Sequence, residues 1–69
     1  MLNVTNFIEA VEIAEVAFAE GKPLKAAYWI GQATVYADQA SPEEWAVIRK
    51  DYSKVYSKWR GFRSMCQTY

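Results

Sequence analysis

Apolar residues recur along the chain with the 3.6-residue period of amphipathic helices, and turn-forming residues divide this pattern into three segments. In the first segment, Asn6 and Glu9 have the form of a capping box, with the Asn6 side chain able to accept a hydrogen bond from the Glu9 backbone N–H. Gly21 stands at the position after a helix where glycine is common. The apolar positions between them are Phe7, Val11, Ala14 and Phe18. The pattern predicts a helix over residues 6–20.

The second segment begins at Pro23, which suits the first turn of a helix, and its pattern predicts a helix over residues 23–40. Apolar residues cover much of its circumference, as expected of a helix that packs against more than one neighbour. One side carries Leu24, Ala27, Tyr28, Gly31 and Val35, and the adjoining side carries Ala26, Trp29, Ile30, Ala33 and Ala37. Because glycine in a helix interior costs about 1 kcal/mol relative to alanine, we expect another helix to approach closely at Gly31 and Ala27. This helix should be the most buried one.

The third segment has the clearest helix start in the chain. Ser41 suits the N-cap, Pro42 the first helical position, and Glu44 the third, where its carboxylate also meets the positive end of the helix dipole. Apolar residues then follow at alternating steps of three and four: Trp45, Ile48, Tyr52, Val55, Trp59 and Phe62. This unbroken stripe predicts a single helix over residues 42–60 or beyond.

The two connections are only a few residues long, so successive helices should lie antiparallel. No stretch shows the strict two-residue alternation of a half-buried strand. The sequence therefore predicts an all-α protein in which residues 1–69 form a single helical domain, a compact antiparallel three-helix bundle. Three helices can cover only part of the apolar surface of the first one, which consists of Phe7, Ile8, Val11, Ile13, Val16 and Phe18.

The small residues of the first two predicted helices resemble those of a tetratricopeptide-repeat hairpin. The spacing of the repeat's second helix is present at Gly21, Ala26, Ile30 and Ala33. Ile13 and Ala14 are similar to a Leu-Gly pair in its first helix. The chain departs from the family pattern at Asp38, where the repeat has proline, and no second repeat follows. The resemblance implies a tightly packed helical hairpin rather than shared ancestry.

Size and composition fit a small globular protein. The chain has 69 residues, of which 52% are hydrophobic and 23% charged, and eight basic residues balance eight acidic ones. A neutral total gives no long-range attraction to nucleic acid or to an anionic membrane. Glutamates interrupt the apolar N-terminal run, and we expect neither a signal peptide nor a membrane span. A lone cysteine, Cys66, cannot form an intramolecular disulfide, so we expect a cytoplasmic protein.

Few residues are available for catalysis. The chain has no histidine, the commonest general base and metal ligand, and one cysteine cannot build a thiolate zinc site. Its three glycines are scattered and form no phosphate-binding loop. Glu9, Glu12 and Glu15 drift around the helix instead of converging on a cation. We therefore expect no enzyme activity, no cofactor and no metal site.

Charge is divided unevenly along the chain, with a net −5 over residues 1–44 and a net +5 over residues 45–69. The acidic first helix can attract the basic third helix, each surface pair contributing at most about 1 kcal/mol, or either face can dock an oppositely charged partner. Lysines and rings of the third helix fall on opposite sides, whereas a surface that stacks nucleic-acid bases needs them together. The residues expected to contact a partner are Arg49, Lys50, Lys54, Tyr56, Lys58, Arg60, Phe62 and Arg63.

These observations favour a small non-enzymatic protein-binding module. It would be an inhibitor, adaptor or regulator that occupies the surface of another protein, of the kind that compact viral and mobile-element genomes encode. A nucleic-acid-binding protein that uses the basic face of the third helix is one alternative. The other is a structural subunit of a homo-oligomer, such as a homodimer that covers the surplus apolar surface.

Overall fold

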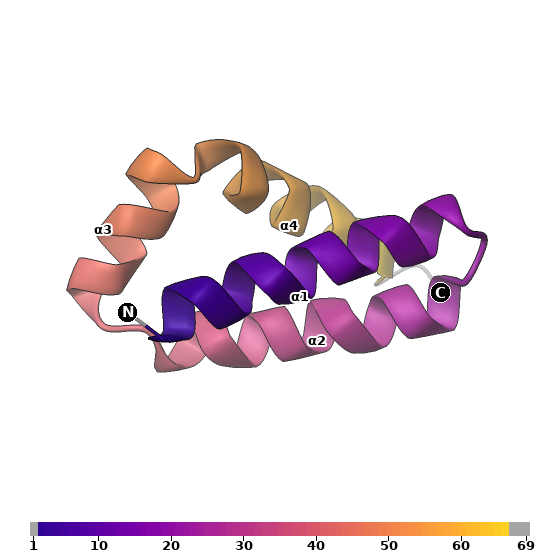
Figure 1. Ribbon diagram of the computed structural model, residues 1–69, viewed down its shortest axis with the longest axis horizontal. Coiled ribbons are helices and arrows are strands. Elements are labelled where there is room, and N and C mark those ends of the chain that lie inside the picture. Colours follow the sequence, from indigo (N-terminus) through magenta and orange to yellow (C-terminus); the bar gives the residue numbers. More distant parts are fainter. Residues whose placement is uncertain (1, 67–69) are drawn as a thin grey trace.

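The computed structural model describes residues 2–66, which form four α-helices and no strand (Figure 1). The helices are α1 (Leu2–Ala19), α2 (Pro23–Gln39), α3 (Pro42–Asp51) and α4 (Ser53–Cys66). The all-α prediction is confirmed, but the predicted third helix is two helices. None of these four helices is both long and apolar enough to cross a membrane.

Helices α1 and α2 form an antiparallel hairpin closed by a glycine turn. Gly21 has a φ of 73°, the left-handed region that glycine adopts without a steric penalty. The Lys22 N–H donates to the Ala17 carbonyl at 2.9 Å, and the Gly21 N–H donates to the Phe18 carbonyl at 3.1 Å. These two bonds are those of a Schellman motif, so the predicted helix stop at Gly21 is confirmed.

The start of α1 differs from the prediction, because the helix begins at Leu2 and runs through Asn6. Tertiary contacts hold the additional turn. Val4 is buried, and the Asn3 side-chain amide donates to the Gln39 carbonyl and to Glu44 Oε1, both at 3.3 Å. The predicted cap at Asn6 is therefore wrong, since packing of the preceding residues extends the helix beyond its local signal.

Small side chains let the two hairpin helices approach each other. The core contains Ala10, Ala14 and Ala17 of α1 and Ala26, Ala33 and Ala37 of α2. Gly31 takes no part in this contact: it is exposed, and a Cβ atom placed there would meet nothing within 4 Å. The predicted close approach at Gly31 is wrong, because α1 packs on the opposite side of α2. Helix α1, with six buried residues against four in α2, is the most buried helix.

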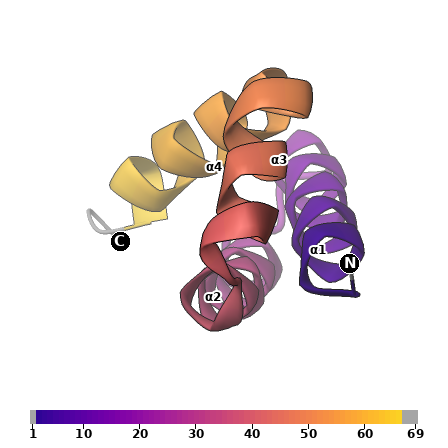
Figure 2. The same ribbon diagram turned by 90° about the vertical axis from the view of Figure 1, so that its left-hand side faces the viewer.

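The predicted third helix breaks at Tyr52, whose backbone has φ −123° and ψ 41°. Helix α3 leaves the end of α2 at a steep angle, and α4 turns back along the hairpin (Figure 1). Figure 2 shows α1 and α4 on opposite sides above α2, with α3 crossing the near end. A straight helix could not return to the hairpin, whereas the break buries Ile48 of α3 and Trp59 of α4 and leaves Tyr52 41% exposed.

The predicted start at Ser41 is confirmed as a full capping box. The Glu44 N–H donates to Ser41 Oγ at 3.2 Å, and the Ser41 N–H donates to Glu44 Oε1 at 3.1 Å. Because Asn3 donates to the same Oε1 atom, the cap also ties α1 to α3.

Aromatic rings join α1 to the α3–α4 unit. The Phe7 ring meets Trp45 at a centroid distance of 6.4 Å and Trp59 at 5.5 Å, both edge-to-face. The Trp59 indole N–H donates to Thr34 Oγ1 at 3.1 Å, and that hydroxyl donates to the Ile30 carbonyl at 2.9 Å. No buried side-chain polar atom of residues 2–66 lacks a hydrogen-bond partner.

Candidate functional site

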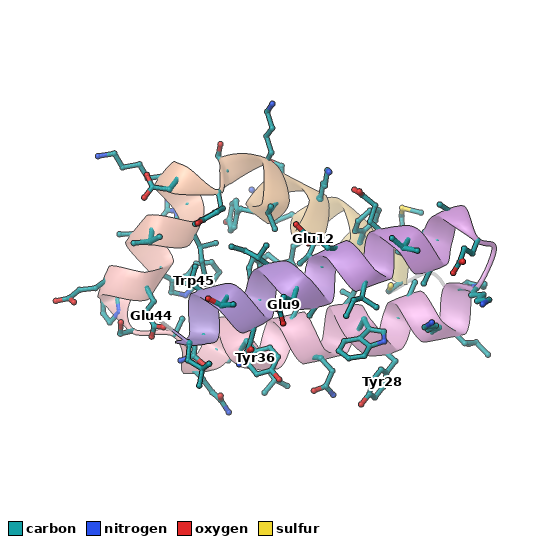
Figure 3. All side chains as sticks on the ribbon, viewed as in Figure 1. Glu9, Glu12, Tyr28, Tyr36, Glu44 and Trp45 are labelled. Atoms are coloured by element: carbon teal, nitrogen blue, oxygen red, sulfur yellow. The ribbon has the colours of Figure 1, made fainter. Side chains whose placement is uncertain are left out.

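An open groove of about 460 Å³ lies at the angle between α3 and α4. We call it the α3–α4 groove, and its lining consists of Ala40, Pro42, Trp45, Ala46, Arg49 and Tyr56. It combines two aromatic rings, one guanidinium group and small side chains. Figure 3 labels Trp45 at the inner side of α3, where it faces the hairpin.

The break at Tyr52 creates the groove. It turns α4 so that the Tyr56 ring meets the Trp45 ring at a centroid distance of 5.8 Å and an interplanar angle of 85°. The Tyr56 N–H donates to the Tyr52 carbonyl at 2.9 Å, which fixes the first turn of α4. Trp45 sits in the first turn of α3, whose Ser41 cap holds its start. Both rings are half-buried, so each packs on the core and keeps an accessible part.

The groove carries positive charge at its edge. Arg49 lines it and is exposed, and the Arg60 guanidinium carbon lies 5.9 Å from the centroid of the Tyr56 ring. A cation over an aromatic face is attracted by the electron-rich face of the ring. The Glu44 carboxyl forms no ion pair with Arg49 or Arg60, and its Oε1 atom accepts hydrogen bonds from the Ser41 N–H and the Asn3 side chain. The Ser41 backbone N–H is the main cause that lowers the pKa of Glu44.

The structure separates the other residues that the sequence predicts for partner binding. Lys58 Nζ lies 2.8 Å from Glu15 Oε2, an exposed ion pair that joins α4 to α1. Such a pair is expected where the acidic first helix attracts the basic C-terminal part of the chain. Phe62 is half-buried, with its ring 4.8 Å from that of Phe18.

Three further cations of the predicted set lie apart from the groove lining. The Arg63 guanidinium carbon lies 5.2 Å from the Trp59 ring centroid. Lys50 and Lys54 are exposed and form no ion pair within residues 2–66. Of the eight predicted residues, Arg49 and Tyr56 line the groove and Arg60 borders it.

Sequence reasoning missed the contribution of Trp45 and Pro42. The periodicity places Trp45 in the core stripe, and it does pack on Phe7. Only its place in the first turn of the helix, close to the Ser41 N-cap, indicates that one side of its ring lies at the edge of the fold.

A second open groove, of about 330 Å³, lies along α1 at the start of α2. We call it the α1–α2 groove, and it is lined by Glu9, Glu12, Ile13, Val16, Ala17 and Lys25. Ile13 is 37% and Val16 56% exposed, so part of the apolar surplus predicted for the first helix is left uncovered.

Residues 2–66 contain no group of three or more side chains of the His, Cys, Asp and Glu types that could hold a metal ion. Burial raises the pKa of the Cys66 thiol, so less of it is present as the reactive thiolate.

In comparisons with known proteins, no family model, no curated protein and no solved structure matches the chain.

Proposed function

We propose that the chain is a small non-enzymatic protein-binding module whose α3–α4 groove receives a segment of a partner protein. The observation that carries this proposal is the groove itself, an open cavity of about 460 Å³ with Trp45 and Tyr56 in its lining and Arg49 beside them. Trp, Tyr and Arg are the residue types that most often dominate the binding energy of protein interfaces. A protein can act as an inhibitor, adaptor or regulator simply by occupying the surface of its partner, without catalysis.

The chemistry of the lining indicates the kind of segment that fits. Small residues such as Ala40 and Ala46 leave room beside the rings for one apolar or aromatic side chain. Arg49 and Arg60 favour a carboxylate next to that side chain, because an Arg–carboxylate contact is a charge-assisted and frequently bidentate hydrogen bond. The proposed ligand is therefore an acidic protein segment with an apolar anchor.

The lining supports binding rather than catalysis. It contains no histidine, cysteine or carboxylate, the side chains that most often act as general base or nucleophile. The alternative of nucleic-acid binding is supported by exposed Lys50 and Lys54, but Lys58 is paired with Glu15. Protein binding is the better-supported function, and nucleic-acid binding becomes an outcome of the same test.

The test is affinity capture from the native host with two matched variants. Ala46→Arg fills the groove from an exposed helical position, whereas Ser57→Arg adds the same side chain to an exposed position of α4 outside the lining. We expect the wild-type chain and Ser57→Arg to retain one stoichiometric protein, and Ala46→Arg to lose it. A protein retained equally by both variants would place binding elsewhere. Recovery of nucleic acid alone, lost as salt is raised, would favour the alternative.

A further inference from the structure

The hairpin has a second face that neither α3 nor α4 covers. On α1 this face contains the lining of the α1–α2 groove, with half-exposed Ile13 and Val16. On α2 it starts at Lys25, and the helical period places Trp29, Gln32 and Tyr36 on the same side, at i+4, i+7 and i+11. We call this surface the open hairpin face. Glu9, Glu12 and Tyr36 are labelled on it in Figure 3, and Tyr28 of α2 points away from α1.

The two helices contribute opposite charges to this face. The α1 side carries Glu9 and Glu12, and the α2 side carries Lys25. None of the three forms an ion pair within residues 2–66, whereas Glu15 and Glu20 are paired with Lys58 and Lys22. The open hairpin face therefore has an acidic half with two carboxylates on α1, a basic half with one ammonium group on α2, and apolar side chains between them.

Such a surface is complementary to a copy of itself. In a two-fold dimer the same patch is used by both subunits. A two-fold axis parallel to the helices places α1 of each copy over α2 of the other, so that the acidic half meets the basic half twice. A two-fold axis across the helices places α1 over α1, and the glutamates of the two copies would repel. Charge complementarity thus selects the first arrangement.

We propose that a second copy of this chain covers the open hairpin face, with α1 packed against the partner's α2 around a two-fold axis parallel to the helices. Ile13 and Val16 become buried in this dimer, and Lys25 of each copy faces the acidic half of the other. The α3–α4 grooves lie outside the contact, so one dimer presents two of them to a bivalent partner.

The experiment is a charge exchange followed by sedimentation equilibrium. Lys25→Glu alone places like charges opposite each other at both symmetric contacts, and so does Glu9→Lys with Glu12→Lys. In an equimolar mixture of these two proteins, however, every contact pairs opposite charges again. We expect the wild-type mass to double between about 1 and 200 µM, each charge variant to dimerise at least about tenfold more weakly, and the mixture to form heterodimers.

Lys54→Glu makes the same charge change at an exposed position of α4 and should dimerise like the wild type. Circular dichroism of every variant confirms that the helices are retained. A wild-type chain that stays monomeric at the highest concentration overturns the proposal. So do charge variants that dimerise normally, or a mixture in which no heterodimer forms. Ala46→Arg should dimerise normally, so loss of groove binding and loss of dimerisation are distinguishable.

Discussion

The hydrogen bond between Trp59 and Thr34 joins α4 to α2 inside the bundle. Its removal should lower the free energy of unfolding by an amount that can be worked out from the structure. Trp59 is only 5% exposed, and its indole N–H donates to Thr34 Oγ1 at 3.1 Å. Thr34→Val keeps the shape and β-branching of the side chain but leaves the indole N–H without this acceptor. An unsatisfied buried donor costs about 1–3 kcal/mol. We therefore expect Thr34→Val to lower the free energy of unfolding by about 1–2 kcal/mol.

The assay is urea denaturation followed by circular dichroism. In thermal denaturation, each kcal/mol of lost stability should lower the melting temperature by roughly 4–8 °C for a domain of this size. Val35→Thr, the reverse exchange at a position of α2 that is 46% exposed, should change stability by less than about 0.5 kcal/mol.

A double-mutant cycle isolates the bond itself. The Trp59→Phe variant has no indole N–H that could be left without an acceptor. In that background Thr34→Val should therefore lower the free energy of unfolding by about 1 kcal/mol less than it does in the wild type. The reasoning is refuted if Thr34→Val is as stable as the wild type, or if its cost is the same in both backgrounds.

Three further predictions concern local structure and pH. Gly31→Ala should stabilise the protein by up to about 1 kcal/mol in thermal denaturation, because the added Cβ meets no neighbour within 4 Å. Gly21→Ala should instead destabilise it by about 1–2 kcal/mol, because its φ of 73° penalises any side chain. The Ser41 N–H lowers the pKa of Glu44 in the folded chain, so the ionised carboxylate stabilises the fold. This contribution is complete above the pKa that Glu44 has in the unfolded chain, and it is lost as pH falls through its pKa in the folded chain. Urea midpoints of the wild type should therefore fall more than those of Glu44→Gln between about pH 5 and pH 3, and equal falls would contradict this cause.

Of the six residues that line the α3–α4 groove, two could be predicted from sequence, together with Arg60 at its border. The excess of basic residues over positions 45–69 indicated this part of the chain, and the predicted set included Arg49, Tyr56 and Arg60. It could not show that Lys58 is paired with Glu15, or that Phe62 packs on Phe18. Both contacts join residues far apart in the chain, and a periodicity describes only one helix at a time.

The sequence by itself determined the features that depend on local geometry. Gly21 ends α1 because glycine accepts a positive φ, and Ser41 with Glu44 starts α3 because their side chains satisfy free backbone N–H groups. The helical class followed from the period of the apolar residues. All of these are properties of a few consecutive residues, so no knowledge of the rest of the fold was needed.

Only the tertiary structure decided the break at Tyr52 and the exposure of Gly31. No glycine or proline marks the break, and the apolar stripe passes through it without interruption. The chain bends there because α3 and α4 each bury their own large residues, Ile48 and Trp59, in a core that one straight helix could not cover. The same bend brings Trp45 and Tyr56 together, so the α3–α4 groove exists only in the folded chain.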